Sequence, residues 1–214
     1  MQFVERKRVI KDLEARKQIS DAIGSALDEL VRDKMTGLVE EPDITSRVGQ
    51  RLEDRFDGKI LGGYGIRVIT ETVTSHGPKS LEKPMGTDLY LAVEIEDAIG
   101  NATSKGVLIQ AKRIDKISGS DLVEQCRRMN LITKKGSVVW MYDKTGIKVA
   151  RSPDVEQGSM APFGNAEFFN RVLKCSIGDK RKVPNGKFGD RRELKIMLEA
   201  LGAQNAVWLE LDKR

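Results

Sequence analysis

Apolar residues recur along the chain with two different periods, which predict two kinds of element. Near the N-terminus, Ile19, Ile23, Leu27 and Leu30 recur every three or four residues, with charged residues between them. This spacing places apolar side chains on one face of a helix. Similar patterns predict helices at 41–58, 118–135, 165–177 and 191–202, and one or two helices within 2–35.

The period changes to two after the sequence LGGYG, at residues 61–65. Alternating or short continuous apolar runs are typical of strands. We expect strands at 66–74, 87–96, 107–113, 137–143, 147–152 and 206–212. The first three are expected to form a meander, followed by a helix and two more strands. This order predicts an α/β or α+β domain with a mixed central sheet flanked by helices.

The length of 214 residues suits one domain with a substantial core. We interpret residues 1–214 as a single domain. Within it, residues 1–40 form an N-terminal helical extension and residues 155–214 form a C-terminal elaboration.

Composition and charge limit the function classes without selecting one. Apolar residues make up 39% of the chain and charged residues 32%, a globular balance. No apolar run approaches the roughly 20 residues that span a bilayer, and the charged N-terminus does not resemble a signal peptide. The two cysteines, Cys126 and Cys175, are too few for a usual zinc site and are expected to be buried apolar residues. We therefore expect a cytoplasmic protein. Its net charge of +5 permits a polyanionic partner.

The strand at 107–113 ends in two long polar side chains. Gln110 and Lys112 are two residues apart and therefore share a face of the strand. If strands 87–96 and 107–113 form a hairpin centred near residue 100, Asp88 falls opposite residues 110–112. The sequence therefore predicts that a carboxylate, an amide and an ammonium group meet at one end of this hairpin.

These residues, in the order GTDL, LIQAKR, LVEQCRRM and VVWMYD, resemble the PD-(D/E)XK nuclease superfamily over about residues 44–150. The chain is similar to members in which glutamine replaces the first acidic residue of the (D/E)XK motif. The resemblance implies a restriction-endonuclease-like fold. It also implies an active site that uses Mg²⁺, or Mn²⁺, to hydrolyse phosphodiester bonds.

The resemblance also implies the role of each residue. Asp88 would be the main metal ligand, joined by the side-chain oxygen of Gln110 and the backbone carbonyl of Ala111. Lys112 would position or deprotonate the attacking water, or stabilise developing charge. Glu53, from the preceding helix, would complete the ligand set directly or through water.

Further residues are candidates for binding nucleic acid. Gln125, in the helix that follows the motif, is a candidate contact to the site or to the substrate backbone, although a structural role is the simpler interpretation. Basic residues in two Gly- and Pro-containing segments are candidates for phosphate contacts, although such runs are usually solvated surfaces. They are Lys79, Lys83, Lys180, Arg181 and Lys182.

The resulting hypothesis is a Mg²⁺-dependent DNA endonuclease acting in restriction or anti-phage defence. Such an enzyme is expected to work as a homodimer or higher oligomer, or with a partner protein that supplies specificity, and away from membranes. A junction or repair nuclease is a second enzymatic alternative. The alternative from another class is a non-catalytic nucleic-acid-binding or assembly module that retains the fold.

Overall fold

The computed structural model describes residues 10–35, 41–72, 87–100, 102–117, 119–133 and 136–214. Its main helices are α1 (Leu13–Met35), α2 (Glu41–Phe56), α3 (Ser120–Ile132), α4 (Ser152–Glu156), α5 (Asn165–Leu173) and α6 (Arg191–Ala200), with a short 3-10 helix at Ile114–Lys116. Its strands are β1 (Ile60–Leu61), β2 (Tyr64–Thr72), β3 (Leu89–Glu96), β4 (Ala102–Arg113), β5 (Ser137–Asp143), β6 (Gly146–Arg151), β7 (Phe163–Gly164) and β8 (Asn205–Lys213).

The described strands form one mixed sheet in the order β1-β2-β8-β3-β4-β5-β6-β7. Strands β3 and β4 form an antiparallel hairpin, while β4 and β5 run parallel and are joined through α3. The expected mixed α/β architecture is therefore confirmed.

The expected meander of three successive strands is wrong. The C-terminal strand β8 lies between β2 and β3, antiparallel to β2 and parallel to β3. Its central residues Ala206–Leu211 are all buried, as a strand with neighbours on both sides and helices on both faces requires. Within the predicted C-terminal elaboration at 155–214, β8 is therefore part of the central sheet.

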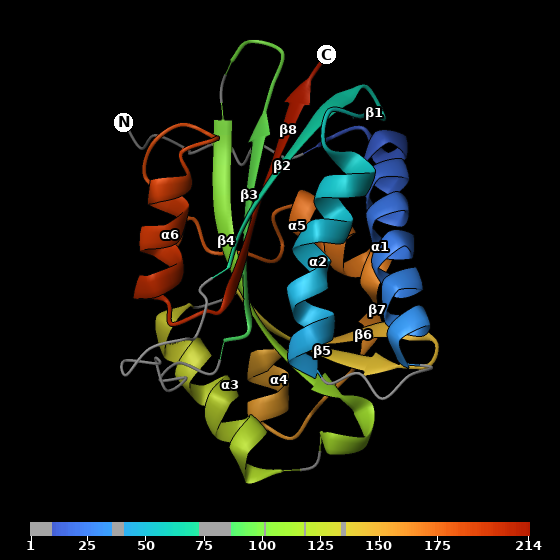
Figure 1. The fold of residues 1–214 in the computed structure, drawn as a ribbon, viewed down its shortest axis with the longest axis vertical. Helices are drawn as coiled ribbons and strands as arrows, with labels where there is room; N and C mark the ends of the chain where they lie inside the picture. Colours follow the sequence, from blue (N-terminus) through green and yellow to red (C-terminus); the bar gives the residue numbers. More distant parts are fainter. Residues whose placement is uncertain (1–9, 36–40, 73–86, 101, 118, 134–135) are drawn as a thin grey trace, which may run out of the picture.

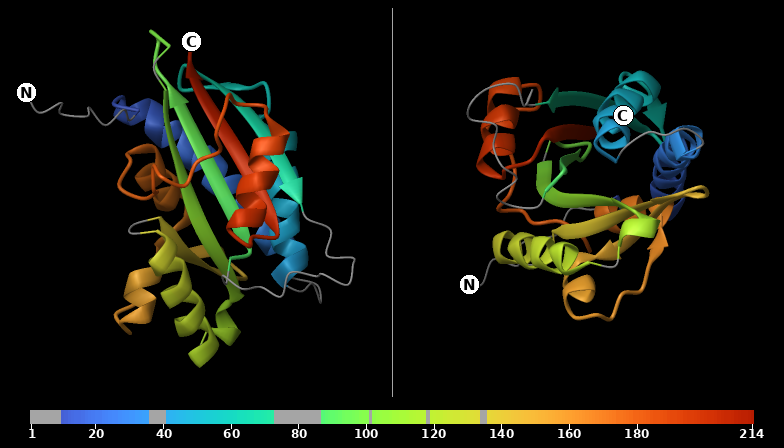
Figure 2. Two further views of the ribbon diagram at one scale, coloured as in Figure 1. Left: turned by 90° about the vertical axis from the view of Figure 1, so that its left-hand side faces the viewer. Right: turned by 60° about the horizontal axis from the view of Figure 1, so that its bottom comes forward.

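Helices cover both faces of the sheet, which gives three layers (Figure 1 and Figure 2). On one face, α1, α2 and α5 pack on the apolar side chains of the larger core cluster, which includes Leu91, Ile109 and Leu209. On the other face, α3, α4 and α6 cover a second cluster that includes Leu108 and Trp208. Because side chains alternate along a strand, successive residues of β4 pack into different core clusters.

Among the described helices, none is both long enough and apolar enough to cross a lipid bilayer. The longest, α1, is 23 residues long, and charged residues lie between the buried apolar residues that face the sheet.

Candidate active site at the end of strands β3 and β4

The register of the β3–β4 hairpin brings Asp88 to Gln110, as the sequence predicted. Leu89 pairs with Ile109, and the Asp88 amide donates to the Ile109 carbonyl at 2.9 Å. Asp88 immediately precedes β3, at the position opposite Gln110. From this point β4 runs on beyond the end of β3, with β5 as its neighbour.

The Asp88 carboxylate binds the part of β4 that has no β3 residue beside it. Its Oδ2 atom accepts a hydrogen bond from the Ala111 amide at 2.9 Å and another from Gln110 Nε2. The Asp88 carbonyl accepts from the backbone and side-chain amides of Asn205, at 3.2 and 3.3 Å. Asp88 is therefore fixed from β4 on one side and from β8 on the other, and only 7% of its surface is exposed.

The contribution of Asn205 was not predicted from the sequence. Asn205 begins a strand that is distant along the chain, and an asparagine after a turn carries no signal of its partner. Only the insertion of β8 beside β3 brings it to Asp88.

Gln110 is fully buried, yet half of its amide has no partner. Its Nε2 donates to Asp88 and also to the Ala111 carbonyl at 3.1 Å, whereas Oε1 has no hydrogen-bond partner. A buried acceptor without a partner is costly and needs an explanation. A half-turn of the amide exchanges its nitrogen and oxygen, so that the oxygen faces the Asp88 carboxylate and the Ala111 carbonyl.

Mg²⁺ prefers carboxylate and carbonyl oxygens and keeps several waters. The Asp88 carboxylate, the Gln110 side-chain oxygen and the Ala111 carbonyl fit this ligand chemistry. In the part of the chain that the structure describes, no three His, Cys, Asp or Glu side chains gather as a metal ion would need. An ion at this site would therefore be held by one carboxylate and by neutral oxygens.

Lys112 lies two residues beyond Gln110 and therefore on the same face of β4. It pairs in register with Met141 of β5 and is half-buried. The amide and ammonium groups of the motif thus share the side of the sheet that α3 and α6 cover, while Ala111 packs in the opposite core cluster.

The structure does not bring Glu53 to this cluster. Its Oε2 accepts a hydrogen bond from Thr70 of β2 at 2.9 Å, and its Oε1 lies 4.0 Å from Arg191. Thr70 pairs with Val207 of β8, which pairs with Leu91 of β3. Two strand spacings and about three residues separate Thr70 from Asp88, or roughly 14 Å. In addition, α2 covers the face opposite to that of Gln110.

Gln125 lies on α3 beside the buried Cys126, on the same side of the sheet as Gln110 and Lys112. Its Oε1 is also buried and has no hydrogen-bond partner. No contact joins Gln125 to the Asp88 cluster among the described interactions.

The basic segment at residues 180–182 is anchored rather than loose. Arg181 forms a two-pronged ion pair with Asp179, with contacts of 2.9 and 2.5 Å. Asp179 exchanges backbone hydrogen bonds with Gly106 of β4, and Tyr90 donates to the Lys182 carbonyl at 2.9 Å. Gly106 is four residues from Gln110, so the segment crosses the sheet roughly 13 Å from the cluster. Lys79 and Lys83 lie outside the described residues.

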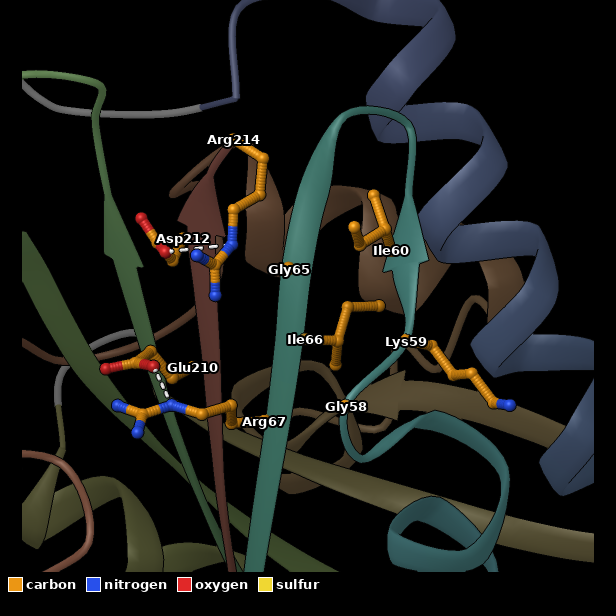
Figure 3. Close-up of a pocket in the computed structure, with 9 residues that line it drawn as sticks. All are labelled: Gly58, Lys59, Ile60, Gly65, Ile66, Arg67, Glu210, Asp212 and Arg214. Atoms are coloured by element: carbon orange, nitrogen blue, oxygen red, sulfur yellow. Dashed lines mark hydrogen bonds and ion pairs between the residues drawn. The ribbon is translucent and has the colours of Figure 1, made fainter.

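A second polar surface lies at the opposite end of the sheet. A pocket of about 250 Å³ is lined by Gly58, Lys59, Ile60, Gly65, Ile66, Arg67, Glu210, Asp212 and Arg214. Figure 3 shows that the acidic side chains there are paired with arginines: Arg67 with Glu210 at 2.5 Å and Arg214 with Asp212 at 3.3 Å. Because these charges satisfy one another, the pocket is a weaker candidate for chemistry than the Asp88 cluster.

Comparison of the chain with protein-family models, with curated proteins and with solved structures finds no match.

Proposed function

We propose that this chain is a metal-dependent endonuclease with a restriction-endonuclease-like fold, which hydrolyses phosphodiester bonds in DNA. The observation that carries the proposal is the buried contact of the Asp88 carboxylate with the Gln110 amide and the Ala111 backbone. Lys112, two residues beyond Gln110 on β4, lies on the same face of the strand as Gln110.

Asp88, Gln110 and Ala111 would hold a Mg²⁺ or Mn²⁺ ion through oxygen atoms. Such an ion neutralises charge on the phosphate and lowers the pKa of a bound water. Gln110 contributes no negative charge, so the site is expected to bind the cation more weakly than a site with two carboxylates. Glu53 is left out of the proposed ligand set because Thr70 and Arg191 hold it away from Asp88.

Lys112 would act on the substrate rather than on the ion. A lysine at this position can hold the attacking water by a hydrogen bond or stabilise negative charge on the phosphate oxygens. Lys182, whose carbonyl accepts a hydrogen bond from Tyr90 on this sheet face, would supply a cation for the flanking DNA backbone, where it would act without reading sequence.

Plasmid cleavage tests the proposal directly. With Mg²⁺ or Mn²⁺, the wild-type protein is expected to nick or cut supercoiled DNA, and Asp88→Ala and Lys112→Ala are expected to lose that activity. Lys17→Ala is the matched control, because Lys17 is an exposed lysine on α1, and α1 packs on the opposite face of the sheet. Each variant is first checked for a cooperative thermal transition. Cleavage that survives both substitutions removes the assigned site.

One observation favours the alternative of a non-catalytic nucleic-acid-binding module. The Gln110 amide nitrogen already donates to Asp88 and to the Ala111 carbonyl, so these contacts form without an ion. This alternative predicts DNA binding without cleavage, equally strong in the wild type and in Asp88→Ala and Lys112→Ala.

The biological setting that we propose is restriction or anti-phage defence in the cytoplasm. Cutting both strands favours a homodimer, a higher oligomer or a partner protein. Comparison of linear, branched and single-stranded DNA and of RNA as substrates separates this role from a junction or repair nuclease, and light scattering gives the oligomeric state.

A further inference from the structure

A buried lysine and a cysteine meet on the face of β4 that α5 covers, away from the Asp88 cluster. Only 2% of the surface of Lys105 is exposed. Its Nζ lies 2.5 Å from the Val172 carbonyl near the C-terminus of α5, and 2.5 Å from Cys175 Sγ. The two residues are separated by 70 positions in the chain, so this contact exists only in the folded protein.

The turn after α5 holds the Cys175 thiol against the lysine. Among the described residues, Cys175 is the one non-glycine residue with a positive φ, at 58°. Side chains other than that of glycine adopt this left-handed conformation rarely. The turn is closed by a hydrogen bond from the Cys175 amide to the Val172 carbonyl at 2.9 Å and one from the Ser176 amide to the Arg171 carbonyl at 2.9 Å.

The two groups have complementary reactivity. Burial lowers the pKa of the Lys105 ammonium, although contact with Cys175 opposes this shift, and a neutral amine has a free electron pair. Cys175 is only partly buried, so it is the more accessible of the two cysteines to a small oxidant. The other cysteine, Cys126, is fully buried, and burial raises the pKa of its thiol, which makes it the less reactive of the two.

We propose that Cys175 and Lys105 form a covalent nitrogen–sulfur bridge when the protein meets a peroxide. In the first step hydrogen peroxide oxidises the thiol to a sulfenic acid, its O–O bond breaks and one water leaves. In the second step the Lys105 amine attacks the sulfenic sulfur, an N–S bond forms, the S–O bond breaks and a second water leaves with one amine proton. The peroxide is the only oxidant required, and the bridge joins β4 to the end of α5.

Peptide mapping by mass spectrometry tests the bridge. The folded protein is treated with hydrogen peroxide, both as wild type and with Cys126→Ala, which leaves a single thiol. The expected product is a linked pair of peptides containing Lys105 and Cys175, lighter than their sum by two hydrogens and without added oxygen. An added thiol reductant is expected to separate them. Lys105→Met, which keeps an unbranched apolar chain, should yield only oxidised Cys175.

A thermal measurement gives a second readout that does not depend on peptide recovery. Closing a loop of this length should raise the melting temperature of the treated protein by on the order of 10 °C, and reductant should reverse the rise. The proposal is overturned if wild-type Cys175 reaches sulfinic or sulfonic acid while Lys105 stays unlinked. It is equally overturned if the bridge forms as fast in urea, where the folded contact is absent.

Discussion

The substitution Gln110→Glu tests both the buried hydrogen bonds of the candidate site and its proposed metal binding. It exchanges the Nε2 donor for an oxygen of nearly the same size, at a position with 0% exposure. In the native chain this nitrogen donates to Asp88 and, at 3.1 Å, to the Ala111 carbonyl. The new carboxylate would instead present an acceptor to two acceptors.

The expected loss in stability follows from these contacts. A hydrogen bond to a charged group contributes about 1.5–3 kcal/mol and a neutral one about 0.5–1.5 kcal/mol. Two carboxylates in contact cannot both ionise, so one retains a proton and recovers one donor. We therefore expect the metal-free variant to lose about 2–4 kcal/mol at neutral pH, a fall in melting temperature of about 5–15 °C for a domain of this size. The loss should shrink on acidification, because the shared proton is then supplied more easily.

Divalent cation should reverse this loss, because two carboxylates hold Mg²⁺ better than a carboxylate and an amide. Binding to the folded state alone stabilises it by about 2.7 kcal/mol at a free concentration 100 times the Kd. The assay is thermal unfolding of wild type and variant in chelator and across a Mg²⁺ series.

Gln50→Glu provides the matched control. Gln50 Nε2 also donates to an aspartate, Asp54, at 2.7 Å, but on the exposed surface of α2. There the same substitution should change stability by less than about 1 kcal/mol and give no response to Mg²⁺. If Gln110→Glu in chelator is no less stable than Gln50→Glu, the buried amide contact is refuted. If Mg²⁺ fails to restore its stability, the metal assignment is refuted.

Three further substitutions test other parts of the structure. Burial, together with the neighbouring Glu210 carboxylate, raises the pKa of Glu94, so the ionised Glu94 carboxylate destabilises the fold at neutral pH. Glu94→Gln should therefore raise the stability measured by urea unfolding, and this gain should fade as the pH falls toward 4.5. Gly106→Ala would place a methyl group 1.8 Å from the Lys182 carbonyl and should cost about 3 kcal/mol; an unchanged urea midpoint would contradict that packing. Glu53→Gln should lower stability by less than about 1 kcal/mol and leave stabilisation by Mg²⁺ equal to that of wild type; a smaller Mg²⁺ response would return Glu53 to the ligand set.

Local patterns were sufficient to predict most elements, because each long helix buries one stripe of its own residues and each long strand contains an alternating or continuous apolar run. The strand predicted at 137–143 matches β5, and the helix predicted at 118–135 contains α3. Strand β7 and helix α4 were missed, since two and five residues are too short to display a period. The hairpin register was also accessible, because a short connection leaves few ways to pair its two strands.

Contacts between distant segments could not be derived in this way. Strand β8 is apolar on both faces, so its sequence shows that it lies inside a covered sheet. The same sequence would suit several positions in the sheet, and it does not show that β2 and β3 are its neighbours. The placement of β8 between β2 and β3 moved Glu53 away from Asp88 and brought in Asn205.

Cys175 is a second case in which the sequence alone was insufficient. The sequence interpretation as a buried apolar residue fits Cys126 but not Cys175, which is partly exposed and lies against Lys105. By itself the sequence determined that the chain alternates helices with strands, and that a carboxylate faces Gln110 across one hairpin. The tertiary structure alone decided which strands are neighbours and which polar groups are buried together, because these depend on packing between segments that the chain does not connect locally.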